Sequence, residues 1–307
     1  MSDVLILNQK LAHSFSYYDL ETGRELHRIT FPEFPHEFAV DRHDRYAYIG
    51  HYGIETHMHR AEGGNEIFVV DVAQAKHVRT LSVWPFRRVH GIVMDGQDRL
   101  YALSEGNSTL LIFDDPRTQE VPNRALPSGG YKSHLVAVSR DGTHAFCTNL
   151  LSNTVTYLRP QDPTFPPRPI SPGLMPEGSC FGADEKTFYV TNRQSETVVS
   201  IDVATLEVTR TARTGVDPTR VYRDGRGRLL VTNYGENSIS VFDEALEPQG
   251  TIGLDHRPIG MSFHPRQPVA YVSFKGDHLG VLDLERLRVE RTFPTLSEPD
   301  VSAVVQV

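Results

Sequence analysis

Short runs of apolar residues recur along the chain with nearly constant spacing. Each run has five residues, is rich in β-branched and aromatic side chains, and in most cases ends in Asn or Ser; the runs span residues 4–8, 47–51, 100–104, 145–149, 188–192, 229–233 and 270–274. Turn sequences such as Asp141-Gly142 and Asp224-Gly225 lie between them and the preceding apolar run. Runs of this length between such turns predict β-hairpins rather than helices.

The spacing of the runs predicts the architecture. Their last residues follow one another at intervals of 41 to 53 residues, and several runs are followed by a second one that ends in an aspartate, such as Asp202 or Asp243. Four short strands in a repeat of about 40 to 45 residues are typical of a propeller blade. Seven repeats therefore predict an all-β, seven-bladed β-propeller with four-stranded blades, in which residues 1–307 form a single domain.

The two ends of the chain predict how the ring closes. Residues 4–8 read as the second strand of a blade, whereas residues 300–307 read as a lone first strand. We expect the C-terminal strand to pair with the N-terminal blade, because this pairing closes the ring and removes an exposed sheet edge.

Composition and charge exclude several classes of protein. Of the 307 residues, 39% are apolar and 23% are charged, so the chain can bury a core and is not of the disordered type. Its 31 basic and 39 acidic residues give a formal charge of -8, whereas a nucleic-acid-coating surface is basic. The sequence has neither an apolar run of transmembrane length nor the pattern of a secretory signal. We therefore expect a cytoplasmic protein with a small-molecule substrate and no nucleic-acid or membrane partner; its oligomeric state is not predicted.

One repeat motif resembles a known family. The sequence Tyr189-Val190-Thr191-Asn192, followed by the run at 197–202, is similar to the repeat of the YVTN family of β-propeller proteins, which is related to the lactonase-type propellers. The resemblance extends over the whole chain and is closest in the fifth and sixth repeats. It implies the seven-bladed fold and, as one activity among several that this family hosts, the hydrolysis of lactones.

Equivalent positions in different blades predict a site on the propeller axis. The first strand of each blade runs along the central channel from one face, so residues at the start of these strands meet around the axis. We call the seven residues at these positions the ring residues; they are His36, His90, His134, Glu177, Thr219, Ile259 and Asp300, and they are spaced 40 to 54 residues apart.

The chemistry of the ring residues favours a metal site. Imidazole and carboxylate groups together are ligands that suit first-row metal ions. We expect His36, His90, His134 and Glu177 to bind a divalent ion (Zn, Fe, Mn, Ni or Cu), with Asp300 as the partner of one ligand. The alternatives are a metal-free pocket for acid–base chemistry and a purely structural role for these side chains.

A second set of candidates lies at the ends of the predicted second strands, on the same face. His51 stands where most repeats have Asn or Ser, and it precedes the long loop 52–64, which carries Tyr52, His57 and His59. The loop either covers the channel as a lid or forms a solvated surface. We expect His51 to take part in catalysis, and the other three residues to contact the substrate.

Four further candidates belong to this set, and the ring residue Glu177 has a second candidate role. Arg193 is a candidate for binding a carboxylate or phosphate group and for catalysis, and Glu177 is a candidate general base. Tyr234 and Lys275 occupy equivalent places in later repeats. Asn192 either contacts the substrate or pins the loop that follows it.

These candidates support three hypotheses about function. The first is a metal-dependent enzyme that acts on a small polar molecule at the channel mouth, by lactonase-like hydrolysis or by oxygen chemistry. The second is a metal-free isomerase or lyase that uses His and Glu for proton transfer and Arg193 for binding. The third is an interaction scaffold without catalytic activity.

Overall fold

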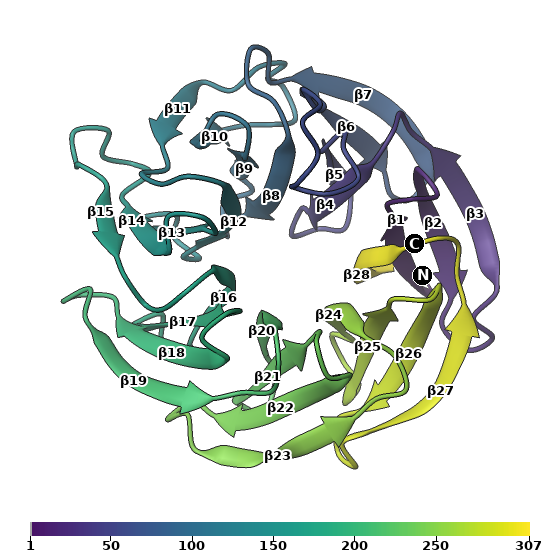
Figure 1. The fold of residues 1–307 in the computed structure, drawn as a ribbon. Helices are drawn as coiled ribbons and strands as arrows, with labels where there is room; N and C mark the ends of the chain where they lie inside the picture. Colours follow the sequence, from purple (N-terminus) through teal and green to yellow (C-terminus); the bar gives the residue numbers. More distant parts are fainter. Residues whose placement is uncertain (1) are drawn as a thin grey trace.

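The chain forms seven four-stranded antiparallel sheets arranged in a ring (Figure 1). The computed structural model describes residues 2–307, and within this range it contains strands, turns and loops but no helix. The predicted all-β, seven-bladed propeller with four-stranded blades is confirmed. In the described part of the chain there is accordingly no helix that could span a membrane.

Each blade is numbered by its place in the ring. Blade 1 consists of β1 (Asp3–Gln9), β2 (Ser14–Asp19), β3 (Glu25–Thr30) and β28 (Pro299–Gln306); blade 2 of β4 (Pro35–Val40), β5 (Tyr46–His51), β6 (Glu66–Asp71) and β7 (Lys76–Ser82); blade 3 of β8 (Val89–Met94), β9 (Leu100–Ser104), β10 (Thr109–Phe113) and β11 (Arg124–Pro127). Blade 4 consists of β12 (Ser133–Val138), β13 (Ala145–Asn149), β14 (Thr154–Leu158) and β15 (Arg168–Ile170), and blade 5 of β16 (Pro176–Phe181), β17 (Thr187–Asn192), β18 (Thr197–Asp202) and β19 (Val208–Arg213). Blade 6 consists of β20 (Pro218–Arg223), β21 (Arg228–Asn233), β22 (Ser238–Asp243) and β23 (Pro248–Gly253), and blade 7 of β24 (Pro258–Phe263), β25 (Val269–Phe274), β26 (His278–Asp283) and β27 (Arg288–Pro294).

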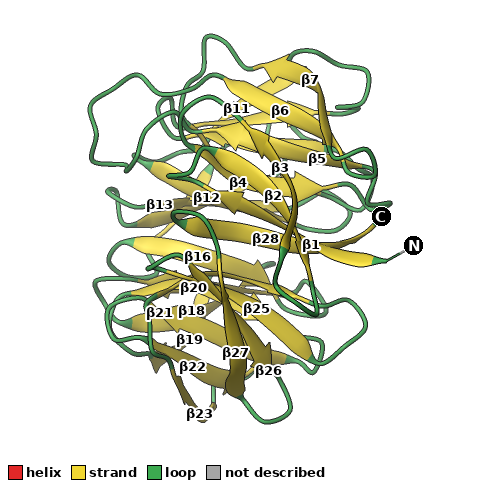
Figure 2. Ribbon diagram, turned by 90° about the vertical axis from the view of Figure 1, so that its right-hand side faces the viewer, coloured by secondary structure: helices red, strands yellow, loops and turns green. Residues whose placement is uncertain are grey.

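The ring closes within blade 1, as the two ends of the sequence predict. Strand β28 pairs antiparallel with β1, and Leu5 lies opposite Val304. The two termini lie side by side (Figures 1 and 2), and Ser2 and Val307 exchange backbone hydrogen bonds of 2.9 and 3.1 Å. Because β28 is the innermost strand of this blade, the closure also completes the wall of the channel.

The hydrophobic core lies between neighbouring blades, where sheet faces pack against each other. Phe146 of blade 4 stacks on Phe188 of blade 5 with ring centroids 4.1 Å apart, and Phe31 of blade 1 stacks on Phe68 of blade 2 at 4.6 Å. The outer strands are largely exposed, and the second and third strands are almost wholly buried. Each blade therefore depends on both of its neighbours for burial of its apolar faces.

The first strands position the ring residues by a common local irregularity. In every blade, the ring residue is the second residue of the first strand and lies in a step where the pairing register with the second strand shifts. In blade 2, for example, Pro35 pairs with His51 and Phe38 with Ile49, so that His36 and Glu37 lie between the two pairs. Such bulges turn side chains out of the regular alternation, and here they open onto the channel mouth.

The packing of the closing blade 1 against blade 7, which we call the seam, can be tested by substitution. Leu5 is fully buried and packs with Leu279 and Phe293 of blade 7. Replacing Leu5 by Ala removes apolar contacts and leaves a cavity, so we expect a loss of about 3 kcal/mol in the free energy of unfolding, measured by urea denaturation. Val208→Ala on the exposed outer strand β19 is the control and should cost less than about 1 kcal/mol. Equal losses in the two variants would contradict this view of the seam.

Candidate active site at the channel mouth

A cavity of about 240 Å³ opens at the face where the first strands begin. All seven ring residues line it, so residues up to 264 positions apart in the sequence share one small space. Tyr52 and His57, from the loop 52–64, also contribute to its wall. The prediction that equivalent strand starts meet around the axis therefore corresponds to what the structure shows.

Three imidazole rings form an arc along one side of this cavity. The ring centroids of His36 and His90 are 4.3 Å apart, and those of His90 and His134 are 3.7 Å apart. The ring of Tyr52 meets His36 and His90 edge-on, with centroids 5.2 and 4.8 Å away. The histidines thus pack against one another in sequence around the wall.

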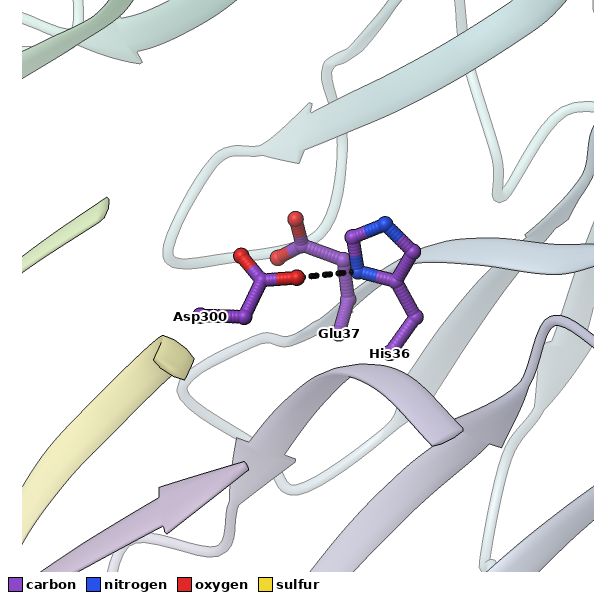
Figure 3. Close-up of side chains that lie close together, drawn as sticks. All are labelled: His36, Glu37 and Asp300. Carbon is purple, nitrogen blue, oxygen red and sulfur yellow. Dashed lines mark ion pairs between the residues drawn. The ribbon is translucent and has the colours of Figure 1, made fainter. Parts of the chain in front are cut away.

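The two outer histidines are each held by a buried carboxylate. Nδ1 of His36 lies 2.7 Å from Oδ2 of Asp300 (Figure 3), and Nδ1 of His134 lies 2.9 Å from Oε2 of Glu105. A carboxylate at Nδ1 orients the ring and stabilises its protonated form, and it leaves Nε2 as the nitrogen that can accept a proton. The His134–Glu105 pair has the arrangement that a general base requires, whereas Nδ1 of His36 lies at ion-pair distance from Asp300 without a hydrogen bond of regular geometry.

The central histidine is electrostatically different. Burial, and then the neighbouring His134 and His36, lower the pKa of His90 well below its usual value. His90 is therefore neutral at neutral pH, and its Nδ1 is buried without a hydrogen-bond partner in the described structure. A neutral imidazole can donate a hydrogen bond to a substrate oxygen without itself carrying charge.

Glu105 connects four side chains at the edge of the cavity. Besides His134, it accepts hydrogen bonds from the Tyr52 hydroxyl, at 2.9 and 3.0 Å, and from Nζ of Lys132, at 3.2 Å. Nη1 of Arg88 lies 3.6 Å from the same carboxylate. Burial alone would raise the pKa of Glu105, but His134, Lys132 and Tyr52 together lower it to about 2. Glu105 is therefore ionised over the whole ordinary pH range.

Glu177 is engaged by two arginines. Its carboxylate accepts hydrogen bonds from Nη1 of Arg193, at 2.8 Å, and from Nη1 of Arg220, at 3.1 Å. Arg193 also binds Asp217 in a bidentate pair, with distances of 2.5 and 2.8 Å. Burial would raise the pKa of Glu177, but Arg193, His134 and Arg220 hold it below the usual value. Each carboxylate oxygen thus already accepts a hydrogen bond from an arginine, and a metal ion bound there would lie next to a guanidinium cation.

Beside the arc, two carboxylates have opposite protonation tendencies. Burial raises the pKa of Glu37. The charge of Arg220 acts in the opposite direction, and the charge of Asp300 raises the pKa further. Burial would also raise the pKa of Asp300, but His36 keeps it below the usual value. The environment therefore favours the ionised form of Asp300 more strongly than that of Glu37.

The donor atoms of the predicted metal ligands do not converge. Among residues 2–307, the one group of three or more His, Cys, Asp or Glu residues whose donor atoms all lie within 4.8 Å of one another is His36, Glu37 and Asp300 (Figure 3). The set predicted from the sequence (His36, His90, His134 and Glu177) is not such a group. Since a tetrahedral ion with bonds of about 2.1 Å needs its ligand atoms closer together than this, the structure does not gather those four residues into one coordination sphere.

Four candidates taken from the sequence lie outside the cavity lining; of the first two, His51 is half-buried and Asn192 is buried. His51 packs against Phe68, with ring centroids 5.3 Å apart, and its Nδ1 lies 3.5 Å from Glu66. Asn192 donates hydrogen bonds to the Pro172 carbonyl and to the Thr197 hydroxyl, which corresponds to the loop-pinning alternative.

The other two candidates outside the lining are on the surface. His59 is half exposed and lies 3.9 Å from Glu55. Lys275 is half exposed and pairs with Glu298. The structure thus gives no support to substrate or catalytic roles for His51, His59, Asn192 and Lys275. The other predicted contacts, Tyr52, His57, Arg193, Tyr234 and Asp300, all line the cavity.

Several residues that matter to the site were not predicted. Glu37, Arg88 and Lys132 belong to this group, and all three lie next to or near a ring residue in the sequence. A usable signal existed for Glu37, because the corresponding positions in three other blades are Gly91, Gly178 and Gly260. A charged residue where other repeats have glycine indicates a specific role.

The loop 52–64 is held against the mouth by the same cations that surround Glu105. Nζ of Lys132 donates to the carbonyl of His57. Nη2 of Arg88 donates to the carbonyls of His59 and Ala61, at 3.0 and 2.6 Å. The loop therefore forms part of the cavity wall, and its position is linked to the carboxylate that orients His134.

Comparison with known proteins supports the fold. The structure is similar to that of a functionally unknown protein from Desulfotomaculum acetoxidans, with a TM-score of 0.82, 13% identity and coverage of 99% of both chains. It is similar to the periplasmic gluconolactonase of Pseudomonas aeruginosa, with a TM-score of 0.79, 15% identity and coverage of 100% of both chains. It is also similar to a chain of hydrazine synthase from Kuenenia stuttgartiensis, with a TM-score of 0.73, 14% identity and coverage of 96% and 93%. No protein-family model and no curated protein sequence matches the chain.

The ion cluster at Glu105 predicts a specific pH dependence of stability. Because the pKa of Glu105 falls from about 4.5 to about 2 on folding, the ionised carboxylate stabilises the fold fully above pH 4.5, and this contribution is lost as the pH falls toward 2. Glu105→Gln should lower the free energy of unfolding at pH 7 by about 3 kcal/mol and make it less dependent on pH below 4.5. Urea unfolding at a series of pH values measures both effects.

The control for this experiment is a carboxylate at the surface. Glu290 pairs with Arg286 and Arg288 on the outer strand of blade 7, and exposed pairs contribute little to stability. Glu290→Gln should leave both the stability and its pH profile nearly unchanged. A Glu105 variant that behaved like this control would show that the buried cluster makes no net contribution to the free energy of unfolding.

The attachment of loop 52–64 can be tested by proteolysis. Arg60 is exposed within the loop and offers a cleavage site for trypsin. Arg88→Gln removes the hydrogen bonds to His59 and Ala61, so the loop should open more often and cleavage after Arg60 should become several-fold faster, as followed by mass spectrometry. Arg87→Gln, which removes only a pair with the exposed Glu62, is the matched control and should leave the rate unchanged. Equal rates for all three proteins would show that Arg88 does not hold the loop.

Proposed function

We propose that the channel mouth is the active site of a hydrolase that opens a small, neutral cyclic ester by general acid–base catalysis. The observation that carries this proposal is the pair of carboxylate-held imidazoles, His134 with Glu105 and His36 with Asp300, facing one cavity. Support also comes from the fold, since a propeller of similar structure is named as a periplasmic gluconolactonase.

The roles of the three histidines follow from their surroundings. His134 acts as the base: a water proton moves to its Nε2, and Glu105, which stays ionised, stabilises the imidazolium that forms. The resulting hydroxide attacks the carbonyl carbon of the ester, and the neutral His90 donates a hydrogen bond to the carbonyl oxygen as negative charge develops there. The bond from the carbonyl carbon to the ring oxygen then breaks, and Nε2 of His36 gives a proton to that oxygen. Return of the proton from His134 to His36 through solvent restores both side chains.

The charge balance of the cavity selects a neutral substrate. Each cation in or beside its wall already has a carboxylate partner: Lys10 pairs with Glu298 at 2.6 Å, Lys132 with Glu105, and Arg193 and Arg220 with Glu177. An anionic substrate would find no unpaired cation, and its desolvation would go uncompensated. Hydroxyl groups, in contrast, can bind to the polar side chains of Thr219 and Tyr234 on the cavity wall. A lactone of a sugar acid has the size and polarity that these observations require.

The same charge balance weighs against an isomerase or lyase with a carboxylate substrate. That alternative needs Arg193 to bind the carboxylate. The Arg193 guanidinium already pairs with the carboxylates of Glu177 and Asp217. A substrate carboxylate would have to displace one of these partners.

A divalent metal ion is the second candidate for the catalytic group. The observation that favours it is the proximity of donor atoms from His36, Glu37 and Asp300 (Figure 3). Glu37, however, is hydrogen-bonded to Arg220 at 2.7 Å, and this guanidinium would repel a cation. If a metal ion were bound by these residues, it would supply Lewis-acid polarisation of the ester carbonyl.

Removal of the proposed base tests the acid–base mechanism. His134→Gln should lower the rate of hydrolysis of glucono-δ-lactone by about 10²–10⁴-fold, because proton transfer by a positioned side chain contributes this much. The measurement is the release of acid in a pH-stat, corrected for spontaneous hydrolysis. His43→Gln, at an exposed position on a surface turn, is the control and should retain the parental rate.

Metal analysis separates the two candidates. On the acid–base proposal, activity survives treatment with a chelator, and elemental analysis of the untagged protein shows no stoichiometric metal. Stoichiometric metal that is lost in an Asp300→Asn variant, together with inactivation by the chelator, would replace the acid–base mechanism by the metal-dependent one. Absence of any lactone hydrolysis in the parent protein would refute both forms of the proposal.

A further inference from the structure

The central channel contains two cavities. We call the candidate active site, at the channel mouth, the upper cavity. The lower cavity, of about 400 Å³, lies further along the first strands. Its wall includes residues from all seven blades, among them Ile92, Val136, Val221 and Phe263. The lower cavity is thus mainly apolar, whereas the upper cavity is lined by imidazole, carboxylate and hydroxyl groups.

An ion pair across the channel separates the two cavities. Nη2 of Arg220, on β20 of blade 6, donates to Oε1 of Glu37, on β4 of blade 2, at 2.7 Å. These blades face each other across the ring (Figure 1), and each of the two side chains is only 11% exposed. Arg220 lines both cavities, and Glu37 lines the lower one. The pair therefore forms the floor of the upper cavity.

The rest of the ring shows why this pair alone can cross the channel. Of the seven positions that follow the ring residues, only those of Glu37 and Arg220 carry charged side chains; the others are Gly91, Leu135, Gly178, Gly260 and Val301. A Cβ atom at Gly178 would lie 2.3 Å from Cα of Arg220, and one at Gly260 would lie 2.9 Å from the carbonyl oxygen of Asp300. Neighbouring first strands thus approach too closely at these glycines for any larger side chain.

A second hydrogen bond of Arg220, on the side of the upper cavity, also holds the floor in place. Nη1 of Arg220 donates to Glu177, which also accepts a hydrogen bond from Arg193, and Arg193 is held in turn by Asp217. A substrate group that reached the floor would have to break a buried, hydrogen-bonded pair of charges to go deeper, and such a break is costly.

We propose that the Glu37–Arg220 ion pair determines the length of substrate that the site accepts. With the pair in place, the site takes compact polar molecules; without it, the upper cavity joins the apolar lower cavity and accepts a molecule with the same polar ring and an alkyl tail. This inference rests on the proposed function for the choice of ligand, but the existence of the floor does not.

Two variants of Glu37 test this role. Glu37→Ala removes the side chain that crosses the channel. Arg220 remains paired with Glu177 in this variant, so its charge keeps a carboxylate partner. Glu37→Gln is the matched control, because it keeps the length of the side chain and can still accept a hydrogen bond from Arg220. Thermal unfolding of both variants verifies that they fold.

The ligands are lactams with the ring of the accepted lactone, unsubstituted or with an alkyl tail of increasing length. Lactams resist hydrolysis, so calorimetric titration measures binding whether or not the protein is a hydrolase. We expect the parent and Glu37→Gln to lose affinity as the tail grows, and Glu37→Ala to bind the longest tail at least about tenfold more tightly than they do, because each buried CH₂ group adds to the affinity. Equal dependence on tail length in all three proteins would overturn the proposal.

A crystal structure of Glu37→Ala provides a test that needs no ligand. We expect a continuous cavity from the channel mouth to Phe263. If Arg220 instead moves to seal the channel, the floor does not depend on Glu37 and the proposal fails. Suppose that the parent does not hydrolyse lactones but the two cavities are joined in this variant. This outcome would refute the proposed function and would still support the role of the Glu37–Arg220 pair as the floor.

Discussion

The pairing of β28 with β1 is the constraint on which the rest of the structure depends. A propeller blade buries its apolar faces only against its two neighbours, so an open ring would expose two sheet faces and one sheet edge. The strand that closes the ring also carries Asp300, and this residue holds His36 of the next blade. The element that completes the core therefore also supplies a part of the site, and the contact between His36 and Asp300 requires the closed ring.

Within the closed ring, the channel is crowded with buried charges, and their mutual pairing decides its chemistry. Burial of an ionised side chain is unfavourable unless a partner of opposite charge and well-directed hydrogen bonds compensate for it. The chain from Asp217 through Arg193, Glu177 and Arg220 to Glu37 meets this requirement by alternating acid and base across the channel. Every member has a partner of opposite charge, so neither arginine is left unpaired to attract an anionic ligand. The reactive groups that remain are the imidazoles, and the proposed function accordingly assigns proton transfer to them.

Glu105 links this chemistry to the loop that borders the cavity. A single carboxylate orients His134 and pairs with the two cations that hold the loop 52–64. The loop carries Tyr52, whose hydroxyl also binds Glu105 and whose ring packs against two of the histidines. Displacement of the loop would thus disturb the proposed base as well as the cavity wall. An arrangement of this kind couples the covering of a substrate to the readiness of the catalytic group.

The sequence by itself determined the seven-bladed ring, its closure and the identity of the seven ring residues. These features depend on local signals, namely the alternation of apolar residues, the turn residues and a repeat that returns the chain to the same place in each blade. Only the tertiary structure decided which side chains meet. The pairing of Glu37 with Arg220 spans 183 positions in the sequence, and the engagement of Glu177 by two arginines depends on the reach of long side chains across the channel. Equivalence in the repeat also did not decide which side chains line the cavity: Arg193 and Tyr234 reach it, whereas Lys275, at the same place in blade 7, pairs with Glu298. The convergence of the histidines depends in the same way on the orientation of each ring, which no repeat pattern specifies. Neighbouring rings are tilted by 53° and 35°, and the three side chains do not offer nitrogen atoms that all lie within 4.8 Å of one another.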